Sequence, residues 1–189
     1  MHLVLMGPPG AGKGTQAQIV AVRLGVPHIS TGDIFRSNVQ QGTELGLQAQ
    51  RYMDAGEYVP DDVTNAMVRD RLGQADCLPG FLLDGYPRTL DQVTELDDIL
   101  ASLGKNLDRV VELTVDREEV VQRLVRRAQD QGRSDDTEEV IRRRMDVYQE
   151  QTTPLLEVYS GRGLLKSVDG MGAVDEVTAR ILASLGVTG

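Results

Sequence analysis

The sequence predicts an α/β fold in which a central parallel sheet of five strands carries helices on both faces. Two observations point to this fold. Short apolar runs alternate with longer stretches of helical periodicity along the whole chain of 189 residues, and strands buried on both faces read as such continuous apolar runs. Parallel strands also need a crossover, usually a helix, between them. The alternation therefore indicates a single domain with a doubly covered sheet.

The predicted strands are short. They are residues 2–6, 27–29, 81–84, 109–115 and 164–168. Because the first strand begins at the second residue, we expect no leader peptide, and no apolar run approaches the roughly 18 residues of a membrane span. We therefore expect a cytoplasmic protein without membrane contact.

A glycine-rich loop follows the first strand and ends in a lysine. Residues 7–15 read Gly-Pro-Pro-Gly-Ala-Gly-Lys-Gly-Thr, in which Gly7, Gly12 and Lys13 fit the phosphate-loop spacing. Gly14 stands where Ser or Thr is usual. Glycines let successive backbone N–H groups point at one anion, and the following helix adds the positive end of its dipole. A plain connecting turn is the alternative, but strand, helix and lysine together favour a nucleotide phosphate site and a three-layer P-loop fold.

The segment after the second strand is too long for a plain connection. Residues 30–59 predict two helices, near 33–41 and 45–55, closed off by Gly56 and Pro60. Such excursions from a rigid sheet are typical of lids and substrate-binding elements.

A polar segment, residues 129–136, separates two further predicted helices. Asp116 with Glu119, and Asp136 with Glu139, have the spacing of helix caps on either side. The predicted division is a core of residues 1–29, 60–125 and 137–189, an insertion of residues 30–59 and a short lid of about residues 126–136.

The charge is acidic overall but unevenly distributed. A formal net charge of −9 argues against nucleic acid or an acidic membrane surface as the main partner. Yet 17 of the 20 basic residues are arginines, and eight of these fall within residues 117–144. Arginine presents a fixed fork of donors that matches phosphate oxygens. We therefore expect a local anion site.

Cysteine and histidine are scarce. One cysteine, Cys77, excludes an internal disulfide, and the two histidines, His2 and His28, give no spacing suited to tetrahedral zinc. The sequence therefore predicts no zinc site.

The second strand leads into the sequence Ser-Thr-Gly-Asp at residues 30–33. A plain helix cap by Ser30 or Thr31 is one interpretation. Arg36, however, lies one turn inside the same helix, where a positive side chain is unfavourable unless an anion shares the helix N-terminus. An anion site is the other interpretation.

The third strand ends in Asp84, and residues 85–89 read Gly-Tyr-Pro-Arg-Thr. The carboxyl ends of parallel strands are where ligands bind, so Asp84 is expected to face the phosphate loop and to hold the water shell of a magnesium ion. The turn delivers Arg88 to the same place. Gln92 lies three residues after Thr89 and either caps the next helix or reads the edge of a base.

Arginines four apart share a helix face, as Arg123 and Arg127 do. A solvated basic face paired with acids such as Glu119 is the alternative to an anion site. Arg133 lies in the polar connection, and residues 142–144 are three successive arginines. At most one of these three can face a cleft.

These motifs together resemble those of the adenylate kinases with a short lid, and the resemblance extends from end to end. It is carried by residues 7–15, by residues 30–33 with Arg36, by residues 83–88 with Gln92, and by residues 132–136 with Arg144. Gly14 followed by Thr15 is the family's own form of the loop. The long zinc-type lid insertion of some relatives is missing, so no structural metal is implied, and Tyr86 stands where phenylalanine is frequent.

The resemblance implies the site residues. The ATP side comprises Gly10, Ala11, Gly12, Lys13, Gly14, Thr15, Arg123, Arg127 and Gly172. The AMP side comprises Thr31, Arg36, Glu57, Tyr58, Val59, Gly85, Tyr86, Pro87, Arg88, Gln92, Arg133 and Arg144. The residues expected to act on the transferring group are Lys13, Arg88, Arg127, Arg133 and Arg144. Magnesium would arrive with ATP.

The expected activity is the reversible transfer of a phosphoryl group from MgATP to AMP, giving two ADP, by a monomer. Two alternatives stay open at this point. A sister enzyme of the same build phosphorylates UMP or CMP, and a nucleotide-binding switch would lack transferase activity. A second set of arginines around Arg36 and Arg88 has no purpose in a switch unless a second phosphate lies opposite the first.

Overall fold

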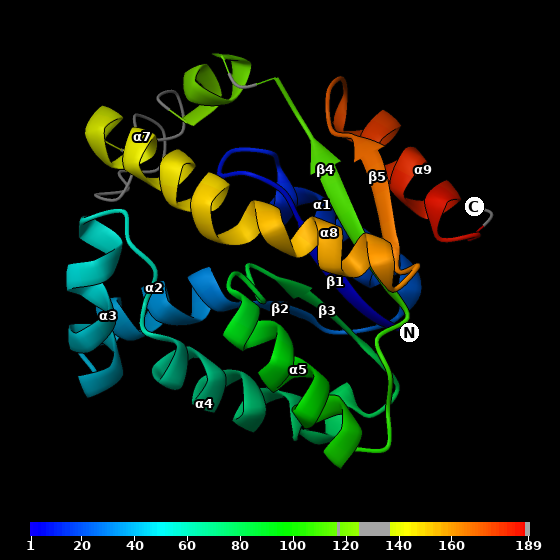
Figure 1. Ribbon diagram of the computed structural model, residues 1–189, viewed down its shortest axis with the longest axis horizontal. Coiled ribbons are helices and arrows are strands. Elements are labelled where there is room, and N and C mark those ends of the chain that lie inside the picture. Colours follow the sequence, from blue (N-terminus) through cyan, green and yellow to red (C-terminus); the bar gives the residue numbers. More distant parts are fainter. Residues whose placement is uncertain (117, 125–136, 188–189) are drawn as a thin grey trace.

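The computed structural model describes residues 1–116, 118–124 and 137–187. Within these residues five strands form one parallel sheet in the order β2-β3-β1-β4-β5 (Figure 1). They are β1 (His2–Met6), β2 (His28–Ser30), β3 (Phe81–Asp84), β4 (Arg109–Thr114) and β5 (Leu165–Asp169). The predicted fold class is confirmed.

Helices cover both faces of the sheet because the side chains of each strand alternate between two cores. Leu3 and Leu5 of β1 point into a core with α1 (Lys13–Leu24) and α9 (Val174–Ser184). Val4 and Met6 point into the opposite core. The helices of that core are α4 (Asp61–Leu72), α5 (Leu90–Ser102) and α8 (Thr153–Gly161). Both cores are apolar, which explains why the strands read as unbroken apolar runs.

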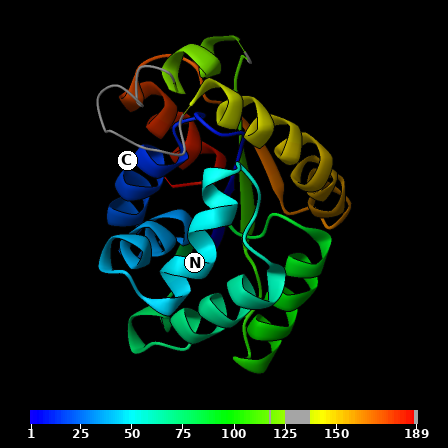
Figure 2. The ribbon, with the colours of Figure 1, turned by 90° about the vertical axis from the view of Figure 1, so that its left-hand side faces the viewer.

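The predicted insertion folds as two helices, α2 (Thr31–Gln41) and α3 (Glu44–Asp54), around a small core of Phe35, Ala49 and Val59. It lies at the same end of the molecule as α7 (Glu138–Val147) in Figure 1, and Figure 2 looks at that end. A short 3-10 turn, η1 (Ala75–Cys77), follows α4, and a π-helical turn, η3 (Tyr148–Thr152), joins α7 to α8. Residues 118–124 are helical.

Element boundaries differ from the predictions by small shifts. Strand β2 begins and ends one residue later than expected, because Ser30 closes the strand and also caps α2 by accepting a hydrogen bond from Asp33 N at 3.2 Å. Strand β4 ends one residue earlier, and β5 lies one residue later. The cap of α7 is Thr137, which accepts from Val140 N, and not Asp136 as predicted. Asp136 and the predicted lid, residues 126–136, lie outside the described residues.

No helix in the described part of the chain combines the length and the apolar character that crossing a membrane requires.

Helices α2 and α3 approach so closely that only glycine fits between them. A Cβ on Gly46 would lie 2.2 Å from the backbone oxygen of Asn38. We therefore expect Gly46→Ala to lower the free energy of unfolding by about 1–3 kcal/mol, because the helices must move apart. Denaturant unfolding measures this change.

Gly161→Ala in α8 is the matched control. A Cβ there meets nothing within 4 Å, so this exchange should be neutral or stabilising by up to about 1 kcal/mol. Equal stability of Gly46→Ala and the parent protein would contradict the close packing of α2 on α3.

Candidate active site

A cleft that is open to solvent lies where the chain leaves the carboxyl ends of β1, β2 and β3. The sheet register places both Leu5 of β1 and Ser30 of β2 beside Asp84 of β3. The three loops that follow therefore begin at the same level of one sheet edge, the edge at which open parallel sheets bind ligands.

The cleft collects the residues expected on its acceptor side. Eleven of the twelve line it, and the twelfth, Arg133, lies outside the described residues. Lys13 of the glycine-rich loop lines the same cleft, so the two predicted halves of the site meet here. The eleven are Thr31, Arg36, Glu57, Tyr58, Val59, Gly85, Tyr86, Pro87, Arg88, Gln92 and Arg144.

The glycine-rich loop has a backbone that other residues would not adopt readily. Gly10 and Gly12 are in the left-handed region, with φ of 81° and 85°. Helix α1 begins directly afterwards, at Lys13, and its first turn contains no acidic residue. The positive end of this helix is therefore not neutralised from within, which suits an anion. The Lys13 ammonium donates to the backbone oxygens of Gly7 at 2.8 Å and Pro8 at 2.9 Å.

Asp84 ends β3 and faces this loop. Its side chain is nearly buried, and a Cβ placed on Gly14 would lie 3.8 Å from its Oδ2. Magnesium is commonly held by one or two carboxylates together with substrate phosphates, and it keeps several waters. A single buried carboxylate beside a phosphate loop fits such an ion. His28 lies on the other side of Asp84, with Nε2 3.5 Å from Oδ2.

Arg88 is held by a contact of its side chain with a ring and by a hydrogen bond to its backbone. Its guanidinium lies 4.9 Å above the centre of the Tyr58 ring. Its backbone oxygen accepts a hydrogen bond from the buried Thr152 hydroxyl at 2.9 Å, and that hydroxyl in turn bonds the Tyr58 hydroxyl at 2.7 Å. Tyr58 lies at the end of the insertion and Thr152 lies in η3, so Arg88 depends on two distant segments for its position.

The insertion contributes Thr31 and Arg36 at the start of α2. The buried Thr31 hydroxyl donates to the backbone oxygen of Gly85 at 2.9 Å, which ties the loop after β2 to the loop after β3. Arg36 pairs with Asp33 of its own helix at 2.5 Å. The cap interpretation is confirmed for Ser30, and Arg36 lines the cleft, where the interpretation as an anion site would place it.

Gln92 is buried, and its side chain does not cap the helix it begins. Thr89 caps α5 by accepting from Gln92 N at 3.2 Å, as the spacing predicts. The Gln92 amide instead accepts from Arg88 N at 2.8 Å and donates to Asp61 at 2.6 Å. The reciprocal half of the expected capping box is therefore wrong, because the amide oxygen that would accept from Thr89 N accepts from Arg88 N instead.

The three successive arginines of α7 point in three directions, as helix geometry requires. Arg142 pairs with Glu138 at 2.8 Å and Arg143 with Glu57 at 2.6 Å, while Arg144 lines the cleft. Arg126, Arg127 and Arg133 lie outside the described residues.

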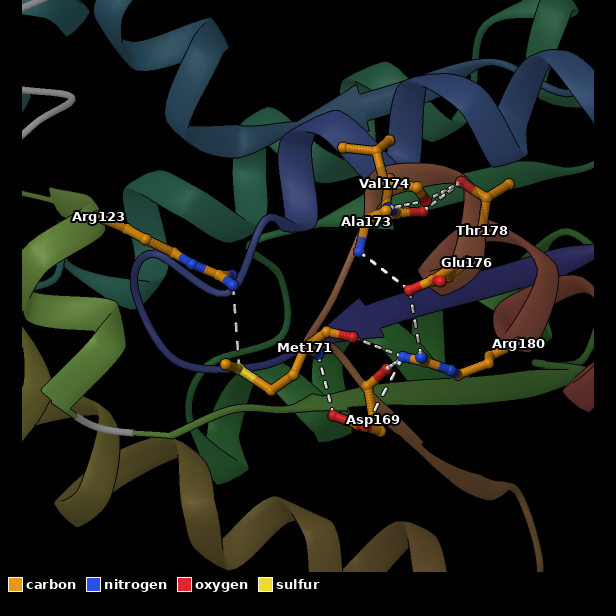
Figure 3. Close-up of polar contacts among 9 residues, drawn as sticks. Arg123, Asp169, Met171, Ala173, Val174, Glu176, Thr178 and Arg180 are labelled. Carbon is orange, nitrogen blue, oxygen red and sulfur yellow. Dashed lines mark hydrogen bonds and ion pairs between the residues drawn. The ribbon is translucent and has the colours of Figure 1, made fainter.

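The loop between β5 and α9 is fixed by charged side chains of α9 (Figure 3). Arg180 Nη1 donates to the backbone oxygens of Asp169 at 2.9 Å and Met171 at 2.6 Å. The Asp169 carboxylate accepts from Met171 N, and Glu176 accepts from Ala173 N at 3.2 Å. These bonds give the loop a single shape.

Gly172 stands at the turn of this loop with φ of 103°, and a Cβ there would lie 2.7 Å from the Glu176 carboxylate. Arg123 reaches toward the loop, with Nη2 4.0 Å from the sulfur of Met171 (Figure 3). Arg123 also pairs with Glu119 at 2.7 Å. The structure therefore brings Arg123 close to the segment that contains Gly172.

The sequence was compared with known proteins. The family model for adenylate kinase matches residues 5–164. The chain belongs to the adenylate kinase family. It is 63% identical over 187 residues to an adenylate kinase of Nocardioides sp., with 99% of this chain and 98% of the relative covered. It is 62% identical over 184 residues to an adenylate kinase of Kocuria rhizophila, with coverage of 97% and 98%. For an adenylate kinase of Thermobifida fusca the identity is 60% over 185 residues, with 98% of each chain covered.

Two of the tyrosines that line the cleft of this adenylate kinase family member, Tyr86 and Tyr148, remain neutral. Burial, reinforced by nearby carboxylates of which Glu95 is the largest contributor, raises the pKa of the Tyr86 phenol, and its hydroxyl bonds Asn65 at 2.8 Å. Burial also raises the pKa of Tyr148. Neither phenol ionises near neutral pH, so neither adds negative charge where phosphates would bind.

Several residues of the site carry no recognisable signal in the sequence. Thr152 and Tyr148 belong to η3, and π-turns have no simple sequence pattern although they are frequent at functional sites. In the sequence, Asp61 is recognisable only as an acidic residue in the first turn of a helix. Arg180 is recognisable only as an arginine within a helix. Thr152 and Asp61 act through contacts with residues far away in the chain, which periodicity does not reveal.

The hydrogen bonds of Thr152 can be tested directly. Thr152→Val should leave the Arg88 backbone oxygen and the Tyr58 hydroxyl without their partner, at a cost of about 1–3 kcal/mol in the free energy of unfolding. Thr94→Val is the control, because Thr94 is exposed on α5 and bonds only its own helix at 3.3 Å. Thermal and denaturant unfolding compare the two variants. Equal effects would contradict a special role for the buried hydroxyl.

Proposed function

We propose that this chain transfers the terminal phosphoryl group of MgATP to AMP, reversibly, and thereby forms two ADP. Its membership of the adenylate kinase family supports this reaction. The observation that carries the proposal is the single cleft in which a phosphate loop with Lys13 faces a second set of cations, Arg36, Arg88 and Arg144. One anion does not need two sets of cations, whereas a donor and an acceptor that both carry phosphate do.

The donor side is assigned to residues 10–15, whose glycines turn the backbone N–H groups toward the phosphates of ATP. Arg123 packs on the adenine beside the loop that contains Gly172, which Arg180 supports. Arg127, which lies outside the described residues, meets the phosphates in this proposal.

The acceptor side is assigned to the eleven cleft residues named above together with Arg133. Thr31 and Gln92 approach the base, while Arg36 and Arg88 bind the phosphate of AMP. Residues 57–59 close the pocket from the insertion. Arg133 and Arg144 reach the AMP phosphate when the segment of residues 126–136 closes as a lid.

Catalysis in this proposal rests on charge and position rather than on a base. The attacking oxygen of AMP is already anionic, so the barrier lies in bringing two polyanions together and in stabilising the transferring group. Lys13, Arg88 and Arg144 supply fixed positive charge for both tasks. Magnesium supplies further positive charge at the phosphates, and Asp84 would hold it through water. Closure excludes water, the competing nucleophile.

The proposal also includes the oligomeric state, the metal requirement and the location of the protein. A monomer is part of the proposal, because the cleft already brings the phosphate loop and the acceptor-side cations together within this chain. Within the described residues no three His, Cys, Asp or Glu side chains gather as a metal cluster. The proposal is an enzyme that needs magnesium but no structural zinc, in keeping with its single cysteine and two histidines. A cytoplasmic location is part of the proposal, because its substrates are nucleotides of the cytoplasm.

Removal of one cleft cation tests the mechanism. Lys13→Ala or Arg88→Ala should lower turnover by roughly 10³-fold or more with the fold intact, because each side chain aligns charge with the transferring group. Arg142→Ala is the matched control, since Arg142 is an exposed arginine of α7 that pairs with Glu138 outside the cleft. A coupled assay for ADP, run with and without AMP, measures turnover. Parental turnover in either cleft variant would remove that residue from the mechanism.

The base of the acceptor is tested by a panel of monophosphates at fixed MgATP. AMP should exceed UMP and CMP by at least roughly a hundredfold in kcat/KM, because a pyrimidine leaves the buried amide of Gln92 unmatched along with other polar groups. Comparable rates with UMP or CMP would leave the phosphate chemistry intact and contradict the assignment of the base.

A further inference from the structure

The amide of Gln92 is held at both ends by groups of opposite character. Its side chain is buried, with 2% of the residue exposed. Oε1 accepts a hydrogen bond from the backbone N–H of Arg88 at 2.8 Å, and Nε2 donates to Asp61 Oδ1 at 2.6 Å. Gln92 lines the cleft, whereas Asp61 does not.

These two partners permit only one orientation of the amide. The backbone nitrogen of Arg88 can only donate, and an ionised carboxylate such as Asp61 can only accept. Rotation of the amide by half a turn would set Nε2 against the Arg88 N–H and Oε1 against the carboxylate. Both hydrogen bonds would be lost, and like groups would face each other in a buried place.

Asp61 is itself fixed. Its second oxygen, Oδ2, accepts from the Thr89 hydroxyl at 2.8 Å, and Thr89 in turn caps the helix that begins beside Gln92. Asp61 also lies in the first turn of α4, where a negative charge is favourable. The carboxylate therefore cannot turn to follow a rotated amide without breaking a second bond.

In this fixed orientation, the Gln92 amide has one hydrogen-bond donor and one acceptor left for a ligand. A primary amide has two N–H donors and two acceptor lone pairs, and the protein uses one of each. Adenine offers a donor at its 6-amino group and an acceptor at the neighbouring ring nitrogen. A 6-oxopurine offers the reverse, an acceptor at O6 and a donor at the ring nitrogen. One fixed orientation of Gln92 can match only one of these patterns.

We propose that Asp61 is a specificity-determining residue that acts by positioning: it fixes the polarity of the Gln92 amide, so that the acceptor pocket takes a 6-aminopurine monophosphate and rejects the 6-oxopurine analogue. Asp61 does not line the cleft and touches no substrate. The inference rests on the proposed function, because it takes Gln92 as the residue that meets the base.

Inosine monophosphate is the suitable probe, since it differs from AMP only in that pattern of donor and acceptor at the purine edge. The experiment measures kcat/KM for AMP and for inosine monophosphate at fixed MgATP in the parent, in Asp61→Asn and in Asp62→Asn. Asparagine keeps the shape of Asp61, but it can donate as well as accept, so it no longer opposes a rotated amide. Asp62 is the exposed neighbour with the same charge in the same helical turn.

The preference for AMP over inosine monophosphate should fall roughly tenfold in Asp61→Asn, the size of one buried polar mismatch. AMP should weaken mainly through KM, and the analogue should improve relative to it. In Asp62→Asn the ratio should stay within about twofold of the parental value. Asp61→Ala removes the acceptor altogether and should move the ratio in the same direction, which keeps the test available if Asp61→Asn proves unstable.

Two other outcomes overturn the inference. An unchanged ratio in Asp61→Asn, or an equal loss for both acceptors, would show that Asp61 serves only the structure. Gln92→Ala separates this failure from failure of the proposed function. If Gln92→Ala narrows the ratio of kcat/KM for AMP to that for inosine monophosphate and Asp61→Asn does not, Asp61 does not fix the amide, but the contact of Gln92 with the base stands. If Gln92→Ala leaves the ratio unchanged, the base contact itself is wrong, and the inference falls with it.

Discussion

The parallel register of β1, β2 and β3 is the constraint on which the whole site depends. It sets the last residues of three strands side by side, with Asp84 beside both Leu5 and Ser30. The loops that leave these strands then share one edge, and the bond from Thr31 to the Gly85 backbone oxygen joins two of them. The register is specified by burial, because a slip by one residue would exchange the side chains of the two cores. The positions of the cleft residues are thus a consequence of apolar packing several residues away.

An acidic protein can gather cations in one cleft only if each cation has a favourable environment before a ligand binds. The described cations show three such arrangements: Lys13 bonds backbone oxygens of its own loop, Arg36 pairs with Asp33, and Arg88 lies on the Tyr58 ring. All three contacts are partly open to solvent, where such interactions contribute about 1 kcal/mol or less. A phosphate offers stronger charge-assisted bonds. The resting contacts therefore hold the cations in place without competing strongly with a polyanion.

The sequence predicted the sheet, the glycine-rich loop and the insertion, because each rests on a local pattern: apolar runs, glycine spacing and helix caps. The predictions that were wrong concern residues that serve two roles or bond to unexpected partners. Strand β2 was placed one residue early because Ser30 serves both as the end of the strand and as a cap, and such a shared role has no separate signal. The spacing of Thr89 and Gln92 predicted a capping box, yet the amide bonds Asp61, 31 residues away. Tertiary contacts of this length decide side-chain partners, and periodicity carries no information about them.

The contact between the insertion and α7 shows how one helix can serve two surfaces. Arg143 pairs with Glu57, and a Cβ on Gly56 would lie 3.0 Å from the Val140 backbone oxygen, so the end of the insertion rests on α7. Successive helical residues point about 100° apart, and Arg144 accordingly lines the cleft while Arg143 meets the insertion. The pair of Arg143 and Glu57 is partly exposed, with 42% and 36% of the side chains accessible, and exposed pairs hold weakly. The insertion and α7 are therefore positioned relative to each other by a contact that can open at little cost, which is what a cleft that must admit and release two nucleotides requires.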